Sequence, residues 1–179
     1  MLLVVAAGVA TAAPAFANSR PSTHVRSRSS VRAEQRLNVQ IVLELNRTRR
    51  AFGLDGLKVN PALSRAAFRH SNEMALSGEF AHESPDGTPF WKRVQRYYPL
   101  SGYATWYAGE ALLWSSPDVS ARAAVADWLA SPPHRKILLD PKWTEVGVSA
   151  VHDGRASGAF RNLECTIVTA DFGVRSGRR

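Results

Sequence analysis

Residues 128–148 read WLASPPHRKILLDPKWTEVGV, and this stretch contains several of the signals that decide the fold. It begins as the end of an apolar helix and reaches Ser131, whose hydroxyl is suited to cap a second helix. Pro132 suits the first position of that helix, because no backbone donor is needed there. Asp140 precedes a proline, which pushes it out of the helical region and ends the helix. We therefore expect His134 on a short helix, either as a site residue or as a residue that only secures a turn.

Helical patterns precede this stretch and strand patterns follow it. Apolar residues recur at helical spacing in four segments: residues 37–52, 61–77, 89–97 and a segment that starts at Ser116-Pro117. Two strands are predicted later, over residues 144–151 and 159–168, with a turn at the Asp-Gly pair between them. Helices first and strands late predict the α+β class, with helices packed on a small antiparallel sheet. Residues 102–108 are predicted to form an aromatic loop. His70 is predicted to be a core histidine.

The net charge of +8 is concentrated in two terminal segments. Residues 18–36 carry five arginines and residues 175–179 three more, while the rest of the chain has 15 basic and 14 acidic residues. Residues 18–36 are also rich in serine, so we predict a linker there, a single domain over residues 37–174 and a basic tail over residues 175–179. The sequence has no basic face with interleaved aromatics, so we expect no nucleic-acid partner. The basic tails would contact the cell envelope weakly, and we expect a monomer.

The first 17 residues are typical of the end of a secretory signal peptide. Residues 2–10 form an apolar run that is too short to span a bilayer, and Ala15-Phe16-Ala17 has the form of a cleavage site. No other stretch is long and apolar enough to cross a membrane, so we expect an extracellular protein without a transmembrane anchor. The single cysteine, Cys165, lies in an apolar strand-like run and is expected to be a buried packing residue.

Several short motifs occur together in one order along the chain. They are Leu45-Asn46-Arg47, Ser77-Gly78-Glu79-Phe80-Ala81-His82, Gly109-Glu110, Trp128 with Ser131-Pro132, His134-Arg135, Thr144-Glu145-Val146-Gly147-Val148 and Asp171-Phe172-Gly173. This ordered set resembles the CAP superfamily, also called SCP-like domains, in its compact bacterial branch. The resemblance covers roughly residues 37–174 and implies an α-β-α sandwich.

The resemblance also implies a cleft with two histidines and two acids. By position the histidines are His82 and His134 and the first acid is Glu110, while Ser131 occupies the place of the second acid. Two imidazoles and a carboxylate would suit zinc or another divalent metal, with water completing the coordination. The alternative is that Glu110 accepts a proton from one histidine and only organises the cleft.

The function implied by the resemblance is that of a secreted binding module. Its cleft would hold a lipid, a sterol, a peptide, a glycan or another component of the cell envelope. The alternative is a metal-dependent hydrolase that uses the same cleft. Ser131 with His134 has the composition of a nucleophile and its base, but helix capping explains Ser131 better. We therefore expect binding rather than catalysis.

Overall fold

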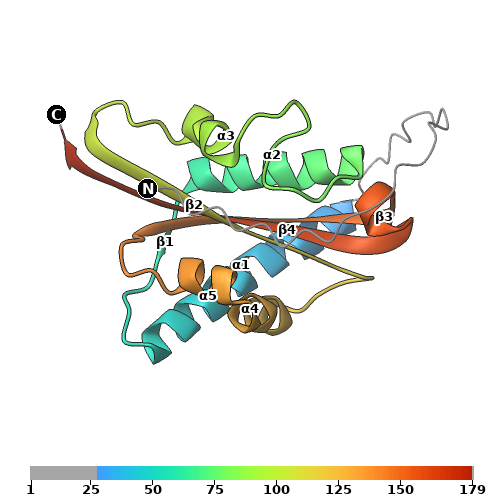
Figure 1. Cartoon of the computed structure of the whole chain (residues 1–179). Helices are drawn as coiled ribbons and strands as arrows, with labels where there is room; N and C mark the ends of the chain where they lie inside the picture. Colours follow the sequence, from blue (N-terminus) through green and yellow to red (C-terminus); the bar gives the residue numbers. More distant parts are fainter. Residues whose placement is uncertain (1–27, 179) are drawn as a thin grey trace.

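The computed structural model describes residues 28–178 and arranges them in three layers (Figure 1). The helices are α1 (Arg28–Ala51), α2 (Pro61–Ser77), α3 (Phe90–Tyr97), α4 (Ala121–Ala130) and α5 (Pro132–Leu138). The strands are β1 (Lys58–Val59), β2 (Tyr103–Ser115), β3 (Glu145–Ala156) and β4 (Leu163–Arg178), with a 3-10 turn at Gly158–Phe160 between the last two. The sheet lies between α2 and α3 on one side and α1, α4 and α5 on the other. The predicted α+β class and α-β-α sandwich are confirmed.

The sheet has the strand order β1-β3-β4-β2. β4 is antiparallel to both of its neighbours, but β1 runs parallel to β3, so the sheet is mixed rather than purely antiparallel. β2 was not among the two predicted strands, and the loop expected over residues 102–108 is largely part of it: Tyr107 pairs with Val174 and Thr105 with Ser176. The same pairing corrects the expected basic tail, since residues 175–178 belong to β4.

The first helix begins well before the expected domain boundary at Leu37. Residues 28–36 belong to α1 and are not a linker, because Glu34 is buried at 5% exposure and its Oε1 accepts a hydrogen bond from the backbone N–H of His152 at 2.8 Å. Three of the arginines that suggested disorder, Arg28, Arg32 and Arg36, are exposed on this helix. The predicted signal peptide and the rest of the predicted linker, within residues 1–27, lie outside the described residues.

Local capping signals set the ends of α2 as the sequence predicted. Asn60 accepts hydrogen bonds from Ala62 N–H at 2.8 Å and Leu63 N–H at 3.4 Å, and a proline follows at the first helical position. Gly78 ends the helix in the left-handed region, with φ 72°, which suits a residue without a Cβ. The body of α2 lies directly on β3, where a Cβ added to Gly147 would stand 2.0 Å from the backbone nitrogen of Ser64.

The two outer strands of the sheet differ in length, and one backbone carbonyl of the longer strand is hydrogen-bonded by a side chain. β1 contains only two residues, whereas β2 contains 13. The indole Nε1 of Trp128 in α4 donates to the carbonyl oxygen of Leu112 in β2 at 2.9 Å, on the side away from β4.

Cys165 is fully buried and carries a free thiol, as predicted, and burial raises its pKa to about 11.

Candidate functional site

Glu110 is the centre of a buried polar network beneath the loop that follows α2. It stands on β2, on the face of the sheet that α2 and α3 cover, and its side chain is 0% exposed. Its Oε1 lies 2.8 Å from the Nδ1 of His82, and its Oε2 accepts a charge-assisted hydrogen bond from the Nη2 of Arg93. Both carboxylate oxygens are therefore engaged by side chains of the protein.

Arg93 was not predicted as a site residue, yet it ties the loop to the network. It is 2% exposed, and its Nη1 donates to the carbonyl oxygen of His82 at 3.0 Å and to the hydroxyl of Ser84 at 3.2 Å. Its position was visible in the sequence, because Arg93 lies three residues after Phe90 and next to Val94, on the apolar stripe of α3. A basic residue on such a stripe indicates a buried acidic partner.

His70 supports the same loop from below. Its ring is fully buried, as predicted for a core histidine, and its Nε2 lies 2.8 Å from the carbonyl oxygen of Ala81, which fixes Nε2 as the protonated nitrogen. The same nitrogen lies 4.0 Å from Oε1 of Glu110. Burial lowers the pKa of His70 and outweighs the charge of Glu110, which raises it, while the charge of Arg93 adds to the lowering. The ring is therefore neutral at neutral pH.

Asp171 is a second buried acid beside Glu110. The two residues are directly paired between β2 and β4, and Asp171 is 0% exposed. As an anion it would have no hydrogen-bond donor among residues 28–178, because neither of its oxygens has a partner there. Burial, and then the negative charge of Glu110, raise the pKa of Asp171 well above its ordinary value, so it is a neutral acid.

The charge of Glu110 is determined by opposing effects. Burial alone would raise its pKa, but the hydrogen bond from His82 and the charge of Arg93 outweigh burial and hold the pKa below its ordinary value. The two neighbouring carboxyl groups therefore differ in protonation, with Glu110 ionised and Asp171 neutral. The sequence motif that begins with Asp171 was recognised, but the chemical role of Asp171 was not, since this role depends on the strand register.

His134 approaches this network from the other layer of helices. It is half-buried on α5, and its pKa is lowered first by burial and then by the charge of His82, so the two imidazoles are near enough to interact electrostatically. Ser131 is at the N-cap of α5, as predicted, but its side chain makes no capping hydrogen bond. Pro133 at the second helical position removes one of the two N–H groups from which a cap side chain can accept, and the other, that of His134, is not used.

The expected zinc ligands do not form a metal site in this arrangement. Within residues 28–178 no three His, Cys, Asp or Glu side chains are arranged to hold a metal ion. Glu110 is occupied by His82, and the guanidinium of Arg93 stands where the charge of a bound cation would be repelled. The residues therefore fit the alternative, in which Glu110 orients His82.

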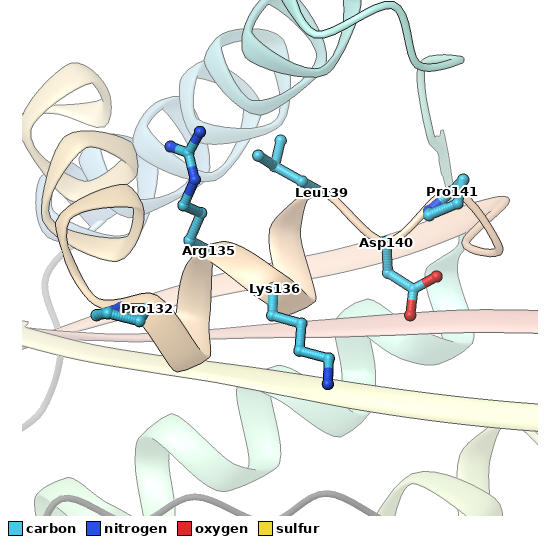
Figure 2. Close-up of a pocket in the computed structure, with 6 residues that line it drawn as sticks. All are labelled: Pro132, Arg135, Lys136, Leu139, Asp140 and Pro141. Atoms are coloured by element: carbon cyan, nitrogen blue, oxygen red, sulfur yellow. The ribbon is translucent and has the colours of Figure 1, made fainter.

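Two surface cavities occur elsewhere on the described residues, and none of the predicted site residues lines them. A shallow one of about 490 Å³ lies on α5 (Figure 2), lined by Pro132, Arg135, Lys136, Leu139, Asp140 and Pro141. Arg135 and Lys136 point to opposite sides there, so their charges do not converge on one ligand. The other, of about 520 Å³, lies between the start of α1 and the segment before α4.

The fold and the His-Glu network together define an SCP-like domain. The profile of the Cysteine-rich secretory protein family, CAP, matches residues 42–172, and the chain belongs to this family. An uncharacterized protein of Bacillus subtilis (strain 168), YkwD, is 32% identical over 146 residues, which are 81% of this chain and 52% of that protein. The chain thus spans about half the length of that relative.

Solved structures support the same fold. An extracellular SCP-domain protein from Bacillus anthracis has a TM-score of 0.65 at 26% identity, over 84% of this chain and 44% of that one. An outer surface protein from Borrelia burgdorferi has a TM-score of 0.59 at 17% identity, over 85% of this chain and 97% of that one. This second likeness concerns the fold alone. Among residues 28–178 there is no helix with the length and apolar character to cross a membrane.

Proposed function

We propose that the chain is a secreted binding module in which His82 and His134 contact a small ligand. The observation that carries the proposal is the contact between His82 and buried Glu110. Because the carboxylate of Glu110 accepts the Nδ1 proton of His82, Nε2 is the ring nitrogen left to meet a ligand. Among residues 28–178 this Nε2 has no hydrogen-bond partner, so a ligand hydroxyl suits it.

The surroundings of His82 favour a ligand that is also partly apolar. The ring of Phe90 is tilted against that of His82, with 6.3 Å between the centroids. Burial lowers the pKa of His134, so this ring is neutral. An imidazole beside an aromatic ring, together with a second imidazole, is suited to a lipid-like molecule with a hydroxyl head, or to a peptide or glycan. The charged members of the network, Glu110 and Arg93, are buried and cannot reach such a ligand.

Two side chains that could serve a hydrolase as nucleophile, Ser131 and Cys165, are not activated in this arrangement. A hydrolytic centre requires a nucleophile or an activated water, together with a base within hydrogen-bond reach. Ser131 makes no side-chain hydrogen bond to His134 among residues 28–178, and Cys165 is buried with a raised pKa. Binding is therefore the function that the geometry supports best.

The test is to recover the ligand with the protein. The chain is expressed in a bacterium that secretes it, purified, extracted with organic solvent, and the extract is analysed by mass spectrometry beside an extract of His82→Ala. The matched control is His152→Ala, which removes a half-exposed imidazole from the far end of β3. A compound that is retained by the wild type and His152→Ala, but lost from His82→Ala, is expected.

Two results would contradict the proposal. Equal retention by all three proteins would place the ligand elsewhere, and conversion of the recovered compound on incubation with the wild type would indicate an enzyme. Stoichiometric zinc binding that is lost in His82→Ala and His134→Ala would favour the metal site instead. Secretion itself is supported by the signal-like residues 1–17 and is tested by N-terminal sequencing, with Asn18 as the expected first residue of the released protein.

A further inference from the structure

The solvent side of α1 carries a continuous basic surface with an apolar centre. At about 100° per residue, seven exposed residues of this helix fall within an arc of about 100°. We call this surface the α1 basic face, and its residues are Arg28, Arg32, Arg36, Val39, Leu43, Arg47 and Arg50. Val39 is 60% exposed and Leu43 is 62% exposed. They stand at the middle of the row, with three arginines before them and two after them.

No acidic residue interrupts this face. The two acids of α1, Glu34 and Glu44, lie outside the arc, and Glu34 is turned toward β3. The ion pairs of basic side chains within residues 28–178 involve other positions, such as Arg69, Arg93 and Lys142. The five arginines of the α1 basic face therefore present their charge to the surroundings, over about 33 Å of helix at about 1.5 Å per residue.

We propose that the α1 basic face binds the surface of an anionic phospholipid bilayer, with α1 parallel to the membrane. Guanidinium groups form paired hydrogen bonds with phosphate oxygens, which suits them to lipid headgroups. Apolar side chains at the centre of a basic helix face enter the boundary between headgroups and acyl chains. Val39 and Leu43 are the apolar side chains that would enter this boundary. Both are exposed and neither packs in the hydrophobic core beneath α1.

The apolar centre favours a bilayer over a soluble anionic polymer. A polymer of phosphate or uronate groups would use the arginines and leave Val39 and Leu43 in water, whereas a bilayer removes them from water. The position of α1 in the fold is compatible with contact with a bilayer. It lies in the layer opposite to α2 and α3, so these two helices stay exposed to solvent when α1 contacts a membrane (Figure 1).

The experiment measures co-sedimentation of the purified full chain with vesicles of phosphatidylcholine, with and without roughly one third phosphatidylglycerol. We expect binding only to the anionic vesicles, and weaker binding at high salt. Arg36→Gln with Arg47→Gln should lower the partition coefficient roughly 30-fold, at roughly fivefold for each arginine. Val39→Ser with Leu43→Ser should lower it at least about tenfold, because two apolar side chains no longer leave water.

A matched control removes two exposed arginines from the opposite layer, by Arg65→Gln with Arg96→Gln, and should change binding less than about twofold. All variants begin at the same residue as the wild type, so a difference in binding reports the substituted side chains. Absence of wild-type binding, or an equal loss in the control, would overturn the proposal. Unchanged binding by Val39→Ser with Leu43→Ser, together with loss in the arginine variant, would also overturn it, because the contact would then be purely electrostatic and the apolar centre would play no part in it.

Discussion

Replacing Asp171 by asparagine should stabilise the protein increasingly as the pH rises. Asp171 is fully buried beside ionised Glu110, which raises its pKa in the folded protein, whereas in the unfolded chain it ionises near pH 4. Stability from such a group is complete below the unfolded pKa and is lost as the pH rises toward the folded pKa. Asparagine has nearly the same shape and no proton to lose in either state. The difference in free energy of unfolding should therefore grow by about 1.4 kcal/mol per pH unit above about pH 4.

The assay is urea unfolding followed by tryptophan fluorescence, from about pH 4.5 to about pH 7.5, on wild type and Asp171→Asn. For a group that stays protonated through pH 7, the accumulated effect is about 4 kcal/mol. The control is Asp127→Asn on the exposed side of α4, where the difference should stay within about 0.5 kcal/mol at every pH. A constant difference for Asp171→Asn would show that the native protein holds Asp171 as an anion, and would refute the account of the paired carboxyl groups.

Three further predictions follow from the same contacts. Glu110→Gln should destabilise the fold by about 3–5 kcal/mol in urea unfolding, because the buried guanidinium of Arg93 loses its counter-charge; a loss below about 1 kcal/mol would mean that water reaches Arg93. Gly147→Ala should cost about 3 kcal/mol or more in the same assay, since its Cβ meets the backbone of α2, whereas Gly154→Ala, with open space around its Cβ, should cost less than about 1 kcal/mol. Cys165 should resist iodoacetamide at about pH 8 until urea unfolds the protein, because its thiol is buried with a pKa raised to about 11; labelling of the native protein, detected by mass spectrometry, would contradict this.

The sequence predicted those parts of the fold that local signals define. The start and end of α2 follow from Asn60, a proline and Gly78, all of which act within one turn of the helix. The strand character of residues 103–108 was missed, because it depends on pairing with β4 some 70 positions later. The early start of α1 was missed for a related reason, since Glu34 is held by a residue of β3. Composition alone made that segment look unfolded.

The candidate site divides in the same way. The resemblance to the family selected His82 and Glu110, and the structure brings them into contact. The resemblance could not identify the roles of Arg93 and Asp171. The role of Arg93 arises from the packing of α3, and that of Asp171 from the register of β4. The side chain of Ser131 makes no capping hydrogen bond, and the prolines that mark the helix start also remove one of the two donors available to it.

The hydrogen bond from Trp128 to Leu112 has a consequence for self-association. β2 is a long outer strand, and exposed strand edges template the addition of strands from other molecules. The indole occupies one outward carbonyl of β2, so a foreign strand could not continue its ladder past this position. At the opposite edge, β1 offers only two residues, which is too short to nucleate pairing. Strand addition is thereby limited at both edges of the sheet: it is interrupted at Leu112 on β2 and restricted to two residues on β1.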